Sequence, residues 1–144
     1  MRRRSFGCLR ISAAFCATAL FAQSNDANVF VYRPREQAGL ARRMTLSLDG
    51  QRLAYLQNGR YLALYLTPGE HQISDKNPDN VLTFKVEPSA VYYIRCEWKQ
   101  TGPAGLSFNA RLSMPSPETG SADMRPLKPG DRKQIQNVSV MVNK

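Results

Sequence analysis

His71 is the only histidine of the chain, so it decides which nucleophilic and metal chemistry the protein could perform. A Ser-His-Asp arrangement or a histidine-based metal site would have to use this residue. His71 follows Pro68-Gly69, a turn-forming pair, and a place at the start of a strand accounts for it without chemistry. No group of His, Cys, Asp and Glu residues stands at the spacing of metal ligands. The sequence therefore predicts no catalytic residue, no metal and no cofactor.

Cys96 is the second residue that could be reactive. A redox thiol needs a partly exposed and electropositive setting. Cys96 alternates with Ile94 and Trp98 in an apolar run, so we expect it to be inert in the core. The two other cysteines, Cys8 and Cys16, lie in a segment that we expect to be removed, which leaves the mature chain without an internal disulfide.

Tyrosines interleaved with arginines could form a binding surface. Such side chains on the outward face of a strand can stack on a sugar or dock a protein strand, and they can also serve only as stabilising cross-strand pairs. The candidate ligand-contact residues are Tyr61, Tyr65, Tyr93, Arg60 and Arg95. Hydrolysis of a glycosidic bond would require two carboxylates that are close in the folded structure but not necessarily in the sequence, and the sequence indicates no particular pair.

The first 22 residues are typical of an export signal. Four arginines without an acid precede an uncharged run that is too short for a permanent membrane span and ends in small residues. We expect cleavage between Ala22 and Gln23, with a site three residues earlier as the alternative. Residues 3–6 match the core of a twin-arginine signal, so the general and the twin-arginine routes both stay open. Either route predicts a periplasmic or secreted bacterial protein.

The mature chain is expected to be mildly basic and free of a lipid anchor. Neither early cysteine directly follows small residues at the end of the apolar run, where a lipoprotein carries its modified cysteine. The chain has 20 basic and 11 acidic residues, and the signal removes four arginines and no acid, so the mature net charge is +5. This charge favours an envelope protein or an anionic polysaccharide as partner and does not indicate nucleic acid.

From residue 28 onward, short runs of alternating apolar and polar residues predict β-strands. Clear examples are 29–33, 60–67 and 90–99, and in the second of these runs we expect Leu62, Leu64 and Leu66 to face inward. The pairs Asp49-Gly50 and Asn58-Gly59 are typical of hairpin turns. About seven short strands predict an all-β fold over residues 23–113, either an antiparallel β-sandwich of immunoglobulin-like type or a small barrel.

Residues 114–144 show a different pattern. Residues 114–133 hold four prolines and two glycines without alternation, and we expect a long Pro/Gly-rich loop there. Residues 134–144 return to alternation, so they could form an edge strand or a free tail.

The order of turn motifs along the chain resembles the DUF2846 family of uncharacterised bacterial secreted proteins and lipoproteins. The resemblance spans residues 28–112 and rests on Tyr32-Arg33-Pro34, Asp49-Gly50, Leu56-x-Asn58-Gly59-x-Tyr61, Pro68-Gly69-x-His71 and Val91-Tyr92-Tyr93. It implies a transthyretin-like or PEGA-type β-sandwich in the cell envelope and no activity. This chain departs from the lipoprotein members because it lacks a lipidation cysteine.

Together these features predict an exported, non-catalytic envelope module that binds protein or polysaccharide through a sheet edge or loop. The alternative is a hydrolase that acts on envelope polymer. A cleft with two carboxylates about 5 to 10 Å apart would favour that alternative.

Overall fold

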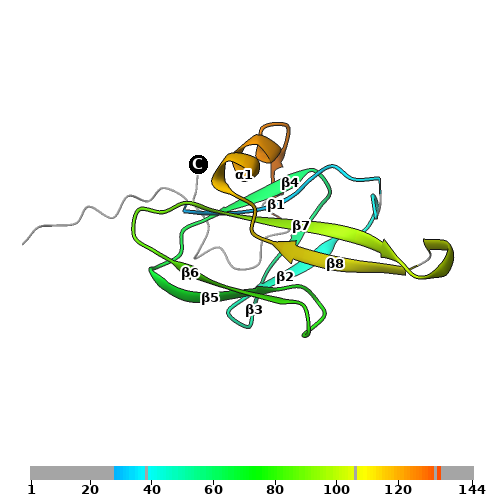
Figure 1. Cartoon of the computed structure of the whole chain (residues 1–144), viewed down its shortest axis with the longest axis horizontal. Coiled ribbons are helices and arrows are strands. Elements are labelled where there is room, and N and C mark those ends of the chain that lie inside the picture. Colours follow the sequence, from blue (N-terminus) through cyan, green and yellow to red (C-terminus); the bar gives the residue numbers. More distant parts are fainter. Residues whose placement is uncertain (1–27, 38, 106, 132, 134–144) are drawn as a thin grey trace, which may run out of the picture.

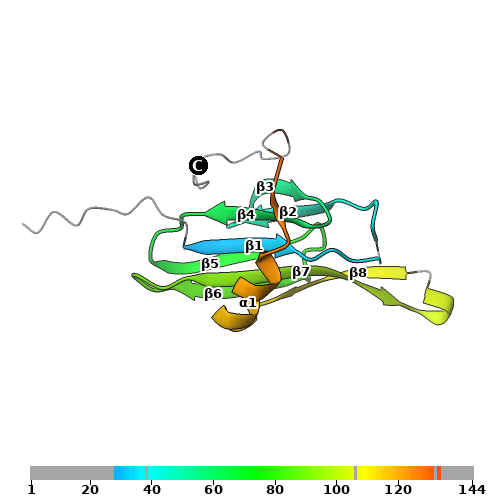
Figure 2. The same ribbon diagram turned by 90° about the horizontal axis from the view of Figure 1, so that it is seen from above.

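The computed structural model describes residues 28–37, 39–105, 107–131 and 133. These residues form two β-sheets packed face to face, with one short α-helix on the outer side of the larger sheet (Figures 1 and 2). The expected cleavage site at Ala22 and Gln23 and the tail 134–144 lie outside the described residues. None of the helices in the described ranges is long and apolar enough to cross a membrane.

The larger sheet has the strand order β8-β7-β1-β4-β9. Its strands are β1 (Val29–Arg33), β4 (Arg60–Leu64), β7 (Tyr92–Thr101), β8 (Ser107–Ser113) and β9 (Lys128–Pro129), and the 3₁₀ turn η1 (Pro103–Gly105) joins β7 to β8. β1 pairs antiparallel with β4 but parallel with β7, and β4 pairs parallel with β9. The prediction of a wholly antiparallel sandwich is therefore wrong for this sheet. Side-chain alternation is the same for both strand directions, so it could not reveal the parallel pairs.

The smaller sheet is antiparallel throughout, in the order β3-β2-β5-β6. Its strands are β2 (Met44–Leu48), β3 (Gln51–Leu56), β5 (Gly69–Ser74) and β6 (Val81–Val86). β2 and β3 form the hairpin predicted at Asp49-Gly50, where both turn residues have positive φ, 50° and 77°. The register shifts in this pair, and Leu53 and Ala54 are both buried as a consequence.

The core lies between the two sheets and is built from the inward residue of each alternating pair. The prediction of inward residues is confirmed on β4 by Leu62 and Leu64 and on β7 by Ile94 and Cys96, all at most 1% exposed. Burial raises the pKa of the Cys96 thiol, so this side chain packs as an uncharged apolar group.

Arg33 is fully buried at one end of this core. Its Nη1 and Nη2 donate hydrogen bonds to the carbonyl oxygens of Arg42, at 2.5 Å, and Gly39, at 2.7 Å. Burial lowers the pKa of the Arg33 guanidinium. The two charge-assisted hydrogen bonds replace those that the guanidinium would form with water in the unfolded chain. Arg33 thereby fixes the connection between β1 and β2, which closes this end of the sandwich.

The predicted loop over residues 114–133 is wrong in part, because it contains β9 and the helix α1 (Pro117–Met124). Ser116 caps the helix: its side-chain oxygen accepts from the Thr119 backbone N–H at 3.3 Å, and Pro117 takes the first helical position. Gly120 is the one residue of α1 that is fully buried. The helix therefore has no apolar stripe of the kind that periodicity detects.

Gly50→Val should lower the free energy of unfolding by about 1–3 kcal/mol, the usual cost of such backbone strain. A Cβ atom at Gly50 would meet no atom within 4 Å, so the cost would come from the positive φ alone. Equilibrium denaturation measures it, with Gly50→Asn as the matched control, since asparagine tolerates this conformation better. Equal stability of Gly50→Val and the wild type would contradict the hairpin assignment.

Candidate functional site

The outer face of the larger sheet carries aromatic side chains from three neighbouring strands. Strand register places Tyr93 beside Phe30, and it places Tyr32 between Arg95 and Tyr61. The Phe30 and Tyr93 rings stack with their centroids 5.5 Å apart. These rings give the sheet an aromatic surface on the side where α1 lies.

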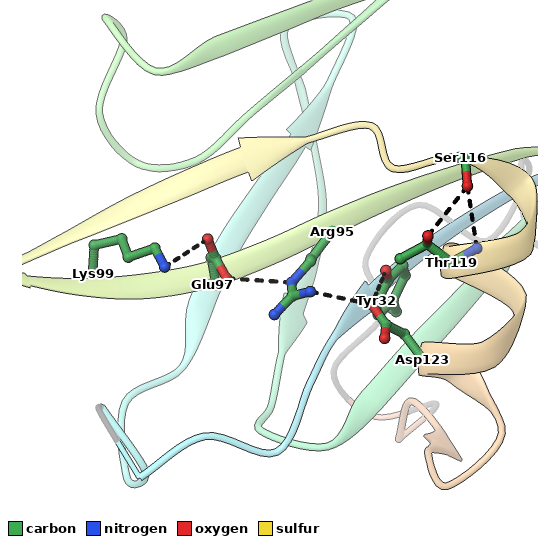
Figure 3. Close-up of polar contacts among 7 residues, drawn as sticks. All are labelled: Tyr32, Arg95, Glu97, Lys99, Ser116, Thr119 and Asp123. Atoms are coloured by element: carbon green, nitrogen blue, oxygen red, sulfur yellow. Dashed lines mark hydrogen bonds and ion pairs between the residues drawn. The ribbon is translucent and has the colours of Figure 1, made fainter.

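Asp123 of α1 joins the helix to this surface (Figure 3). Its Oδ2 accepts a hydrogen bond from the Tyr32 hydroxyl at 2.8 Å and one from Arg95 Nη1 at 3.2 Å. Glu97 extends the network through ion pairs with Arg95 and Lys99, both at 3.2 Å. Burial, followed by the bond to Asp123, raises the pKa of Tyr32 above its usual range. The phenol therefore remains a protonated donor and holds the helix in place.

Close packing at Gly120 also holds α1 on the sheet. An ideal Cβ atom at Gly120 would lie 2.3 Å from both Cβ and Cγ of Tyr93, closer than any real contact. Glycine is a poor helix former, and this contact gives the physical reason for its place in the middle of α1.

An open depression of about 290 Å³ lies between α1 and the sheet. Its lining consists of Tyr61 and Tyr93 from the sheet, Ser121, Met124 and Arg125 from the helix and its C-cap, and Leu127 from the segment that follows. Arg125 is exposed and forms no ion pair with any residue in the described part of the chain. The depression thus combines aromatic and apolar surface with a cation at its rim.

The structure brings together two of the five predicted ligand-contact residues, Tyr61 and Tyr93. Arg95 lies on the same face, but Asp123 and Glu97 occupy its guanidinium. Arg60 belongs to the opposite parity and donates from Nη1 to the Pro129 carbonyl at 3.0 Å. Tyr65 follows β4 and does not line the depression.

The residues missed by the sequence analysis all come from α1 and its ends. Asp123 anchors the helix, and Ser121 and Arg125 line the depression. The run Ser116-Pro117-Glu118, with a capping serine, a proline at the first helical position and an acid in the first turn, is the signal that could have revealed the helix.

His71 lies on β5 in the smaller sheet, away from this depression, and contacts Asp49 of the turn between β2 and β3. Its Nδ1 is 2.8 Å from Asp49 Oδ2, and its Nε2 is 2.8 Å from the Thr67 carbonyl oxygen. Two acceptors can both be satisfied only by the imidazolium form, which donates from each nitrogen. Since Nε2 is bound to a carbonyl, it offers no lone pair to a nucleophile in this arrangement.

The pKa of His71 reflects the same contacts. Burial lowers it, but the bonds to Asp49 and to the Thr67 carbonyl, together with the negative charge of Asp49, outweigh burial and give a net rise. In the described ranges, no three His, Cys, Asp or Glu side chains gather as metal ligands.

Comparison with known families gives one match. The model of DUF2846, described as a protein of unknown function, matches residues 23–107. A search of curated proteins and of solved structures finds no match. The matched span contains β1 to β7 and thus both depression tyrosines, whereas α1 and β9 follow it.

His71 should stabilise the fold in a pH-dependent way. Because its pKa is raised on folding, its contribution should be fully present below the unfolded value of about 6.5 and be lost as the pH rises through the folded pKa. The difference in free energy of unfolding between wild type and His71→Gln, measured from about pH 5.5 upward, should therefore shrink with rising pH. A difference that grows with pH would contradict the two-acceptor arrangement, and direct NMR titration of the imidazole checks the pKa independently.

Gly120→Ala should destabilise the protein although alanine favours helices by about 1 kcal/mol. The added methyl group would collide with Tyr93 and push α1 from the sheet. Ser121→Ala, at the next and exposed helical position, is the matched control and should be neutral or stabilising in thermal denaturation. In the Tyr93→Ala background, Gly120→Ala should cost much less, and an unchanged cost would exclude this contact as the cause.

Proposed function

This chain belongs to the DUF2846 family, and from that premise we propose that it is an exported, non-catalytic module of the bacterial cell envelope that binds a partner through the depression beside α1. For its fold subtype we propose the transthyretin-like or PEGA-type sandwich. The arginine-led segment 1–22 supports export and cleavage before Gln23, to a periplasmic or secreted location without a lipid anchor.

The observation that carries this proposal is that contacts hold the depression in place from two sides. Its floor stands on paired strands, and its wall is fixed by the bonds of Asp123 and by the contact of Gly120 with Tyr93. Binding sites are usually formed before the ligand arrives, since ordering them during binding costs affinity. A depression held from two directions meets that requirement.

The charges around the depression support binding rather than hydrolysis. Its lining residues include no carboxylate in the described part of the chain. Asp123 is occupied by Tyr32 and Arg95, and Glu97 pairs with Arg95 and Lys99. Acid–base hydrolysis of a glycosidic bond needs two carboxyl groups that face the substrate, and neither side chain is free to do so.

The partner that we propose is an envelope protein or an anionic polysaccharide. The expected mature charge of +5 favours partners of opposite charge, and the exposed Arg125 places part of that charge at the site. Such a partner would be held by noncovalent contacts and released unchanged.

The exported protein should co-sediment with isolated envelope material and release no soluble fragments. Retention should weaken as salt lowers the screening length from about 10 Å to about 3 Å. Ser121→Glu, an exposed change in the lining, should reduce retention, whereas Tyr55→Ala on the smaller sheet should not. Intact mass of the exported chain shows whether it begins at Gln23.

Two results would contradict this function. Cleaved fragments that disappear with His71→Ala would make the protein a hydrolase. Retention that Ser121→Glu leaves unchanged would remove the depression from the binding surface.

A further inference from the structure

We propose that the depression binds an acidic polysaccharide whose sugar rings pack against Tyr61 and the exposed part of Tyr93 and whose carboxylate pairs with Arg125. This inference rests on the proposed binding function and narrows its two partner classes to one. It assigns a uronate-type ligand, with one carboxylate on a ring-forming sugar.

The two tyrosines are spaced for more than one sugar. Tyr61 lies on β4 and Tyr93 on β7, with β1 between them, and their partners Tyr32 and Phe30 are two residues apart. With neighbouring strands about 4.8 Å apart and a rise of about 3.4 Å per residue, their Cα atoms are separated by about 12 Å. One sugar ring is shorter than this, so the ligand that reaches both would be at least two linked sugars.

Tyrosine suits this ligand because its ring is apolar and its tip is polar. The C–H face of a sugar ring can lie against an aromatic ring while the sugar hydroxyls bond to the phenol or to water. Stacking with Phe30 and packing under Gly120 fix the position of Tyr93, so little side-chain entropy would be lost on binding.

Arg125 supplies the preference for an acid. It is exposed at the C-cap of α1, and the nearest carboxylate along the chain, Asp123, is already bound by Tyr32 and Arg95. Glu118, at the other end of α1, accepts hydrogen bonds from its own backbone N–H and from Ser116, and these bonds lower the pKa of its carboxyl group. A guanidinium accepts a carboxylate through two parallel hydrogen bonds. A phosphate–polyol chain would match this charge but would bring no sugar ring to the tyrosines.

The edge of the sheet beside the depression argues against a peptide strand as ligand. The Gly59 carbonyl accepts from the Lys128 N–H at 3.1 Å, and the Tyr61 carbonyl accepts from the Gly130 N–H at 2.8 Å. β9 therefore occupies the edge of β4 that an added strand would need next to Tyr61.

Titration calorimetry of the whole exported protein with an oligogalacturonate tests the proposal, with the methyl ester of the same oligosaccharide as the uncharged probe. Arg125→Gln should weaken binding of the acid by about fivefold or more and leave the ester unaffected. Tyr61→Ala should weaken both probes, and Tyr61→Phe should retain stacking. Arg52→Gln and Tyr55→Ala are matched controls, because they remove an arginine and a tyrosine outside the depression, where the Arg52 guanidinium lies 5.7 Å from the centroid of the Tyr55 ring.

Ser121→Glu is a second test of the same proposal, and it leaves the tyrosines of the sheet unchanged. Its side chain is exposed, so the fold should melt as in wild type while the added charge repels the acid. Equal affinity for acid and ester, or tighter binding of a phosphate–polyol chain, would overturn the assignment to a uronate. If no oligosaccharide binds while envelope material is still retained in a manner sensitive to Ser121→Glu, this inference fails and the proposed function stands. If nothing binds, both fail.

Discussion

The carboxylate of Asp123 is the group through which α1 and the larger sheet depend on each other. A helix of eight residues is not stable alone in water, and α1 has no apolar stripe to dock it. The fully buried Tyr32 phenol, in turn, needs an acceptor that the sheet does not supply. One oxygen of Asp123 meets both needs, and it also accepts from Arg95. The helix α1 forms the wall of the depression because the Asp123 carboxylate both docks the helix and accepts the hydrogen bond of the Tyr32 phenol.

The hydrogen bonds and ion pairs around Asp123 also determine which charged side chains near the depression are already paired within the protein. Along the outer face of β7, Arg95, Glu97 and Lys99 alternate in sign, and Glu97, only 7% exposed, lies between its two cations. A carboxylate buried to this extent must be paired, so it occupies cations that would otherwise face solvent. Arg125 lies at the rim outside this network, and it forms no ion pair with the described residues.

The sequence predicted those parts of the fold that depend on alternation and missed those that depend on distant contacts. Leu62 and Ile94 were placed inward correctly, because burial of one strand face is a local pattern. The parallel pairing of β1 with β7 has no such local signature. Glu97 stands on the outward face of its strand, and its burial arises from partners that only the folded chain brings near.

The two parts of the candidate site differ in the same respect. The position of its floor, on the larger sheet, follows from the core, whereas the position of its wall, the helix α1, depends on a few contacts. Tyr61 faces outward because Leu62 and Leu64 face inward, so its position follows from the sandwich itself and lies within the span matched by the family. Ser121 and Arg125 stand on a helix held mainly through Asp123 and Gly120. Changes at the exposed helix positions alter the rim without disturbing the core. The aromatic surface is thus tied to the fold, whereas in the proposed function the preference for a charged ligand would depend on residues of α1.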